Sequence, residues 1–161
     1  MRDKNWVLEH RGGTLKIEHQ KLLMKWAIDC VVHLLPLLNN NINEKINNAL
    51  NIGNNWIIGN VKTGDVINCS REIVKYVKTL DNNIEIALTR AAGHAVATAH
   101  MSDHSMEVVY YGIKAIKYKG GIIETEIKWQ IENIPKDIKE LVIEGLNKKK
   151  IINNGVRLPI A

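Results

Sequence analysis

The chain of 161 residues suits one compact domain over residues 1–161, because domains of about 100 to 200 residues are the norm. Its hydrophobic share of 45%, charged share of 24% and net charge of +5 are typical of a globular protein and exclude a disordered, collagen-like or coiled-coil chain. No apolar run approaches the roughly 18 residues that cross a membrane, and no signal peptide opens the chain, so we expect a cytoplasmic protein.

The first half of the chain predicts three helices. Residues 1–14 form an N-terminal extension, in which paired glycines break any helix. From 17 to 38 the apolar residues recur at spacings of three and four, which predicts an amphipathic helix. The same spacing predicts a second helix over 43–61 and a third over 66–80, for which Asp65 is the candidate N-cap.

The second half predicts a central helix followed by three more. Small residues cover nearly the whole circumference of the segment 84–101, and a helix that is apolar all round is usually buried. A further helix, capped by Ser102-Asp103, is expected to run to Lys119, two more are expected over 123–134 and 136–149, and the tail 151–161 has no period. The sequence therefore predicts an all-α, single-domain bundle of about seven helices around a helix rich in small residues.

Three of the six histidines, His94, His100 and His104, fall within eleven residues of one another near the end of this central segment. On one continuous helix, His100 and His104 lie one turn apart, the spacing at which a helix offers two imidazoles to one metal ion. His94 lies about 120° from His100 around such a helix, so it joins them only if the chain bends at Ser102. Candidate third ligands are Asp29 from the first helix, or Asp103 and Glu107; Asp103 and Glu107 are the nearer along the chain.

Three interpretations of the polar cluster Asp29, His33, His94, His100 and His104 stay open. The first is structural: the imidazoles lie between close-packed helices and find hydrogen-bond partners on the first helix. The second is a polar contact surface for a partner, and the third is a metal or catalytic site. The chain has no His-Glu-x-x-His motif, so we assign no metal and no cofactor.

Other chemistries find little support. Cys30 and Cys69 fall in apolar segments, and we expect both to be reduced core thiols rather than nucleophiles. No glycine-rich loop carries the Lys-Ser/Thr that phosphate binding needs, so no catalytic residue is assigned. With five Arg and no aromatic residues interleaved with a basic patch, the sequence argues against nucleic acid as a partner.

Three ordered blocks of residues carry a family resemblance. The blocks are Arg11-Gly12-Gly13-Thr14-Leu15 with Leu22-Leu23, Trp26-Ala27, Asp29-Cys30 and Leu34-Leu35-Pro36-Leu37; Arg90-Ala91-Ala92-Gly93-His94-Ala95 with Ala97-Thr98-Ala99-His100, His104 and Tyr110-Tyr111; and Trp129-Gln130 with Ile134-Pro135. Together they resemble a bacterial family described as putative immunity proteins of polymorphic-toxin systems. The chain departs from that pattern in its Asn-rich second helix and at 106–108.

The resemblance implies an all-helical, non-enzymatic protein that binds and neutralises a cognate toxin made in the same cell. Inhibitors of nucleases commonly need negative charge, so a protein at +5 favours a toxin that is neutral or acidic, or binding away from the active site of the toxin. The alternatives are a metal-dependent enzyme that uses His100 and His104 with a carboxylate, and a basic helical nucleic-acid-binding module. The contact surface and a homo-oligomeric state stay open.

Overall fold

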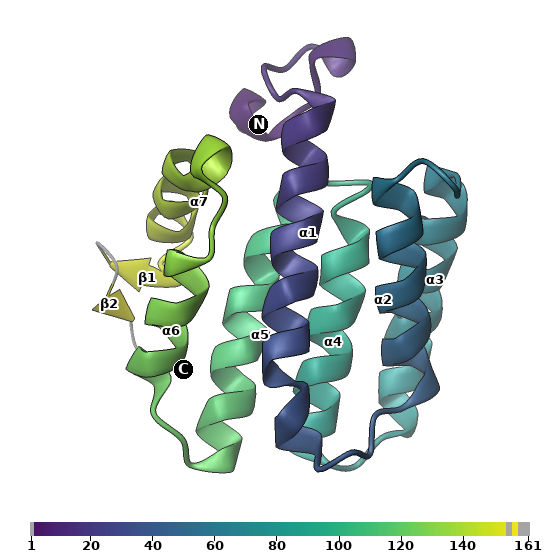
Figure 1. Ribbon diagram of the computed structural model, residues 1–161, viewed down its shortest axis with the longest axis vertical. Coiled ribbons are helices and arrows are strands. Elements are labelled where there is room, and N and C mark those ends of the chain that lie inside the picture. The colour runs from purple at the N-terminus through teal and green to yellow at the C-terminus, as the bar shows by residue number, and fades with distance from the viewer. Residues whose placement is uncertain (1, 154–155, 158–161) are drawn as a thin grey trace.

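The computed structural model describes residues 2–153 and 156–157, and it confirms the all-α class. In this part of the chain seven α-helices form a bundle, and a two-stranded antiparallel hairpin follows them (Figure 1). The elements are α1 Ile17–Leu34, α2 Glu44–Ile57, α3 Thr63–Tyr76, α4 Asn83–Ala97, α5 His104–Lys119, α6 Ile123–Glu132, α7 Lys136–Lys148, β1 Ile152–Asn153 and β2 Val156–Arg157.

Helix α4 lies at the centre of the bundle, as its small residues predict. It packs against α1, α2, α3 and α5, and Figure 1 shows it with α5 on one side and α2 and α3 on the other. Ala91, Ala92 and Ala95 are fully buried and Ala99 nearly so. Small side chains let the neighbouring helices approach α4 closely, and this approach gives the bundle a dense core.

The contact between α3 and α4 is made at a glycine. A Cβ atom on Gly93 of α4 would lie 2.9 Å from Cγ2 of Ile73 on α3, closer than carbon atoms pack in proteins. Ile73 is itself buried and, being β-branched, has little freedom to turn away. Glycine at position 93 therefore sets the distance between α3 and α4.

Several helices end two to four residues before their predicted ends, and two of the differing ends bear on the candidate residues. Helix α3 begins at Thr63, so Asp65 lies in its first turn, where a carboxylate favours the helix dipole, and is not the N-cap. Helix α4 ends at Ala97, four residues before the predicted end. His100 therefore lies in the connection between α4 and α5, and His104 is the first residue of α5.

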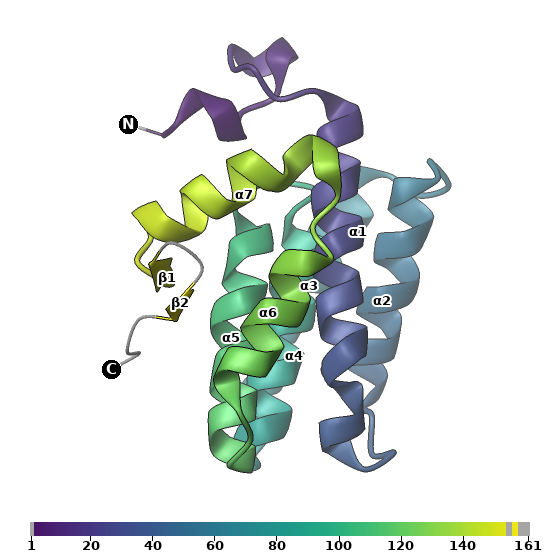
Figure 2. The ribbon, with the colours of Figure 1, turned by 60° about the vertical axis from the view of Figure 1, so that its left-hand side comes forward.

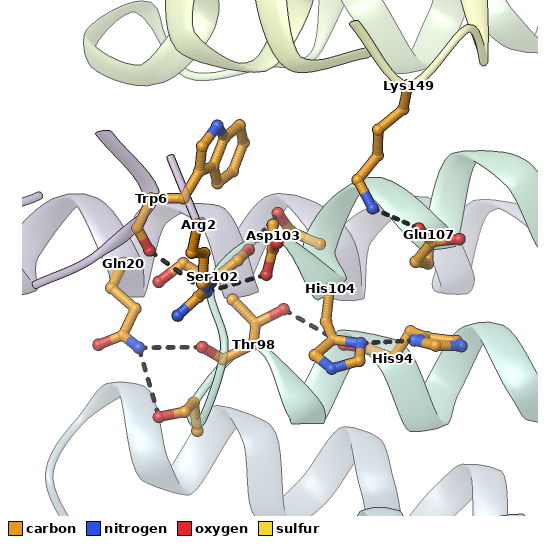
Figure 3. Close-up of polar contacts among 12 residues, drawn as sticks. Arg2, Trp6, Gln20, His94, Thr98, Ser102, Asp103, His104, Glu107 and Lys149 are labelled. Atoms are coloured by element: carbon orange, nitrogen blue, oxygen red, sulfur yellow. Dashed lines mark hydrogen bonds and ion pairs between the residues drawn. The ribbon is translucent and has the colours of Figure 1, made fainter. Parts of the chain in front are cut away.

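The early end of α4 has a partner on α1. The buried side chain of Gln20 donates from Nε2 to the carbonyl oxygens of Thr98 and Ala99, at 3.0 and 3.3 Å (Figure 3). These carbonyl oxygens lie just beyond the end of α4, where a helix leaves its last acceptors unpaired. Gln20 thereby stabilises the bend that separates α4 from α5.

Both ends of the described chain belong to the packed structure. In the predicted N-terminal extension, two short 3-10 helices, Lys4–Trp6 and Glu9–Arg11, bring the buried Trp6 ring against Gly145 of α7. The predicted irregular tail instead forms the β1–β2 hairpin. Residues 154–155 and 158–161 of that tail, and residue 1, lie outside the described residues.

Helices α6 and α7 complete the bundle. Helix α6 packs along α5, and α7 runs across the bundle beneath the N-terminal segment and contacts α1 and α5 (Figure 2). Among the helices described, none combines the length and the apolarity that a bilayer span requires.

Candidate functional site

An open groove of about 650 Å³ runs between α3 and the α4–α5 pair; we call it the α3–α4 groove. The volume lies in the range of typical ligand sites, about 300 to 1,000 Å³. Its apolar lining consists of Ile67, Ile73, Val74, Val77 and Ala97. Val74 presents an apolar side chain to solvent within the groove, because 62% of its surface is exposed.

Two histidines meet at one end of this groove. The Nδ1 atoms of His94 on α4 and His104 at the start of α5 lie 2.8 Å apart and share one hydrogen bond, one nitrogen donating and the other accepting (Figure 3). The Tyr111 ring stacks on His94 with centroids 5.2 Å apart. The bend between α4 and α5 brings His94 and His104 together. On one continuous helix His94 would lie too far around the axis to reach the other histidines of the segment.

Both members of the histidine pair are held neutral. Burial, and next the neighbouring His104, lower the pKa of His94 from 6.5 to about 4. Burial also lowers the pKa of His104, although the nearby Asp103 and Glu107 act in the opposite direction. At neutral pH the pair therefore offers hydrogen-bonding nitrogens to the groove and no charge.

The charge of the groove comes from three cationic side chains: Arg71 of α3, Lys78 in the 3-10 turn that continues α3, and Arg90 of α4. All three are exposed, and none forms an ion pair with a described residue. Arg90 lies 5.9 Å over the Tyr111 ring. No carboxylate lines the groove among the described residues, so the groove is electropositive.

A smaller hollow continues the electropositive surface past Arg90. It measures about 210 Å³ and shares Arg90 and Tyr111 with the α3–α4 groove. Lys114 and the half-exposed Tyr118, both of α5, line its far side. Cationic and apolar groups thus alternate along this face of α3, α4 and α5.

The predicted metal-ligand geometry is not formed. His100 lies in the connection before α5, whereas His104 is the first residue of α5, so the two are not one turn apart on one helix. His100 is exposed and lines the α3–α4 groove. Asp29, one of the candidate third ligands, pairs with Lys25 on its own helix at 2.7 Å. Among the described residues, no group of three or more His, Cys, Asp or Glu side chains is placed to hold a metal ion.

His33 belongs to a separate network, on α1 and α6. Its Nδ1 lies 2.9 Å from a carboxylate oxygen of the buried Glu126, and its ring stacks on Trp129 at 3.6 Å between centroids. Gln130 donates from Nε2 to the same carboxylate at 2.8 Å, and Trp26 donates from Nε1 to the Gln130 carbonyl at 2.9 Å. The expected polar cluster is thus divided among three places. Asp29 lies on α1 beside Lys25, His33 lies beside Glu126, and the remaining three histidines line the α3–α4 groove.

Sequence reasoning missed the partners that lie far apart in the chain. Glu126 and Gln20 carry no local signal, although both are buried polar residues in segments predicted as helical. Arg2 pairs with Asp103 at 2.9 Å and Lys149 pairs with Glu107 at 2.7 Å, which joins both ends of the chain to the start of α5 (Figure 3). The candidate ligands Asp103 and Glu107 therefore serve as ion-pair partners.

Of the two cysteines, Cys30 matches the expected core thiol and Cys69 is only half buried. Burial raises the pKa of the Cys30 thiol well above its ordinary value, and it also raises the pKa of Cys69. A thiol with a raised pKa is a poor nucleophile at neutral pH.

Comparison with known proteins identifies the family. The family model described as Imm-5 like putative immunity protein matches residues 13–137, which include the whole α3–α4 groove. No curated protein and no solved structure matches the chain. Because the matched region covers well over half of the chain, the protein belongs to the Imm-5 like putative immunity protein family.

Proposed function

We propose that this protein is a non-enzymatic immunity protein, which binds a cognate toxin in the cytoplasm and neutralises it by protein–protein contact. The family match over residues 13–137 supports the proposal, because the family is described as one of putative immunity proteins. The α3–α4 groove supports it: an electropositive hollow with an exposed apolar side chain suits a partner surface.

A metal-dependent enzyme is the weaker alternative. One ring nitrogen of His104 is engaged by His94, His100 lies in the turn after α4, and Asp29 is paired with Lys25. The enzyme would be favoured by one equivalent of zinc or nickel in the purified protein that is lost on His104→Ala. Removal of that metal by a chelator should then lower the melting temperature of the wild type.

Expression with a toxin tests the proposed function. A candidate toxin domain, chosen from the genes that neighbour the gene for this chain, is induced in cells with and without the protein. We expect growth only when the protein is present, and a stable complex with a catalytically inactive form of the toxin domain on a sizing column. Toxicity that persists in the presence of folded, abundant protein would overturn the proposal.

A further inference from the structure

We propose that the α3–α4 groove is the toxin-binding surface and that it receives an acidic segment of the toxin that also carries an apolar side chain. This inference rests on the proposed function and adds to it the surface and the chemistry of the partner. It follows from three observations: cations without a carboxylate partner, an exposed valine between two of them, and a neutral histidine pair in the lining of the groove.

The cations of the groove form no ion pair with a carboxylate of the described residues, and Arg90 lies over the Tyr111 ring. Arg71 and Arg90 face each other's helices across one hollow that holds no carboxylate. Like charges gathered around a groove attract an anionic partner and gain free energy when its carboxylates arrive.

The neighbouring acidic residue of α3 is turned away from the groove. Glu72, next to Arg71 in the chain, pairs with Lys45 of α2 at 3.2 Å on the other side of α3. Arg71, Val74 and Lys78 recur at spacings of three and four residues and so share one face. The groove face of α3 is therefore cationic and apolar, and the carboxylate next to Arg71 in the chain pairs with a lysine of a different helix.

The apolar residues favour a protein segment over a nucleic acid. Val74 is exposed between the two cations of α3, and burying it in a complex gains about 25 cal/mol for each Å² removed from water. The phosphates of a nucleic acid would match the cations but leave Val74 without an apolar partner, and the bases of a single strand would find Tyr111 already stacked on His94. An acidic peptide segment with an aliphatic side chain matches both features.

The neutral histidine pair fits the same partner. His94 and His104 add no positive charge near neutral pH, so they leave charge recognition to Arg71, Lys78 and Arg90. His100 at the rim is exposed and free to donate a hydrogen bond to a backbone carbonyl of the bound segment. Recognition thus combines charged, apolar and neutral polar contacts, as in the centre and rim of known interfaces.

A double charge reversal tests the surface. The test variant carries Arg71→Glu and Lys78→Glu. The control variant carries Lys136→Glu and Lys139→Glu, which make the same change in net charge at exposed positions of α7, away from α3 in Figure 1. Melting curves first establish that both variants are folded. We expect the α3 variant to raise the Kd for the inactive toxin domain at least about tenfold and the α7 variant to change it less than about twofold.

A crosslink at the centre of the groove tests the chemistry of the partner. With a photoreactive benzoylphenylalanine at Val74, irradiation of the complex should attach a toxin peptide that contains at least two Asp or Glu residues near an aliphatic one. A crosslink to a basic peptide, or to a second copy of this chain, would overturn the inference. The inference would also be overturned if the wild type bound a short RNA duplex and the double variant Arg71→Glu with Lys78→Glu lost this binding but still bound the toxin.

The two proposals fail in different ways. If the wild type neutralises the toxin and the α3 variant binds it with unchanged Kd, the groove is wrong and the immunity function stands. If the folded wild type neither binds nor neutralises the toxin, the immunity function itself is wrong.

Discussion

His94 and His104 share a hydrogen bond between nitrogens 2.8 Å apart, so protonation of both rings would place two cations in contact. Because the pKa of His94 is about 4 in the folded state and about 6.5 when unfolded, the unfolded state binds more protons between these values. We therefore expect the stabilising effect of a neutral His94 to be complete above pH 6.5 and to be lost as the pH falls towards 4.

Substituting the histidine isolates this effect. Wild type should lose on the order of 2 kcal/mol of unfolding free energy through His94 between about pH 7.5 and pH 5, and His94→Asn should lack that loss. Urea denaturation at the two pH values gives the comparison, with His10→Asn at an exposed position as control. Equal pH dependence in His94→Asn and wild type would contradict the prediction.

Glu126 is a buried carboxylate whose two partners are His33 and Gln130. Glu126→Ala leaves the Nε2 group of the buried Gln130 without an acceptor, so the free energy of unfolding should fall by about 2 kcal/mol. Glu124→Ala, two residues earlier on the same helix but exposed, should change it by less than about 0.5 kcal/mol. Chemical denaturation measures both, and equal effects would refute a structural role for the Glu126 network.

The packing of α3 on α4 depends on the absence of a side chain at position 93. Gly93→Ala should raise helix propensity by about 1 kcal/mol, but its Cβ must displace Ile73, and overpacking of this kind costs about 1 to 3 kcal/mol. We expect a net loss of stability. Gly64→Ala on α3, where the added methyl group meets open space, should leave stability equal or higher.

A melting temperature for each variant decides this point. If Gly93→Ala is at least as stable as Gly64→Ala, the two helices are not held at the distance described. Because the same contact closes one side of the α3–α4 groove, Gly93→Ala should also weaken toxin binding, whereas Gly64→Ala should not.

At the scale of the whole molecule, the N-terminal segment closes one end of the bundle. Only 4% of Trp6 is exposed, and its ring lies against Gly145 of α7. Trp6→Ala should lower the free energy of unfolding by about 3 kcal/mol, through lost burial and the cavity left behind. Lys4→Ala, exposed two residues earlier, should have little effect in the same urea titration, followed by circular dichroism. A small effect of Trp6→Ala on the free energy of unfolding would show that the N-terminal segment does not stabilise the bundle.

The sequence by itself determined the elements and the centre of this protein. Apolar spacing placed all seven helices, because burial of one face repeats every three to four residues and is visible locally. The small residues of α4 predicted its central position, since only such a helix lets four neighbours approach at once. The family resemblance likewise came from residues readable in order along the chain, and the match over 13–137 confirmed the family.

The tertiary structure alone decided where α4 ends and which polar groups meet. Gln20, which donates to the carbonyl oxygens at the bend, lies 78 residues before Thr98. No local pattern in the sequence therefore indicates that His94 contacts His104 and that His100 does not. The α3–α4 groove arose in the same way. Arg71 and Arg90 lie nineteen residues apart on helices that only packing brings together, and a periodicity within one helix carries no information about charges on the next.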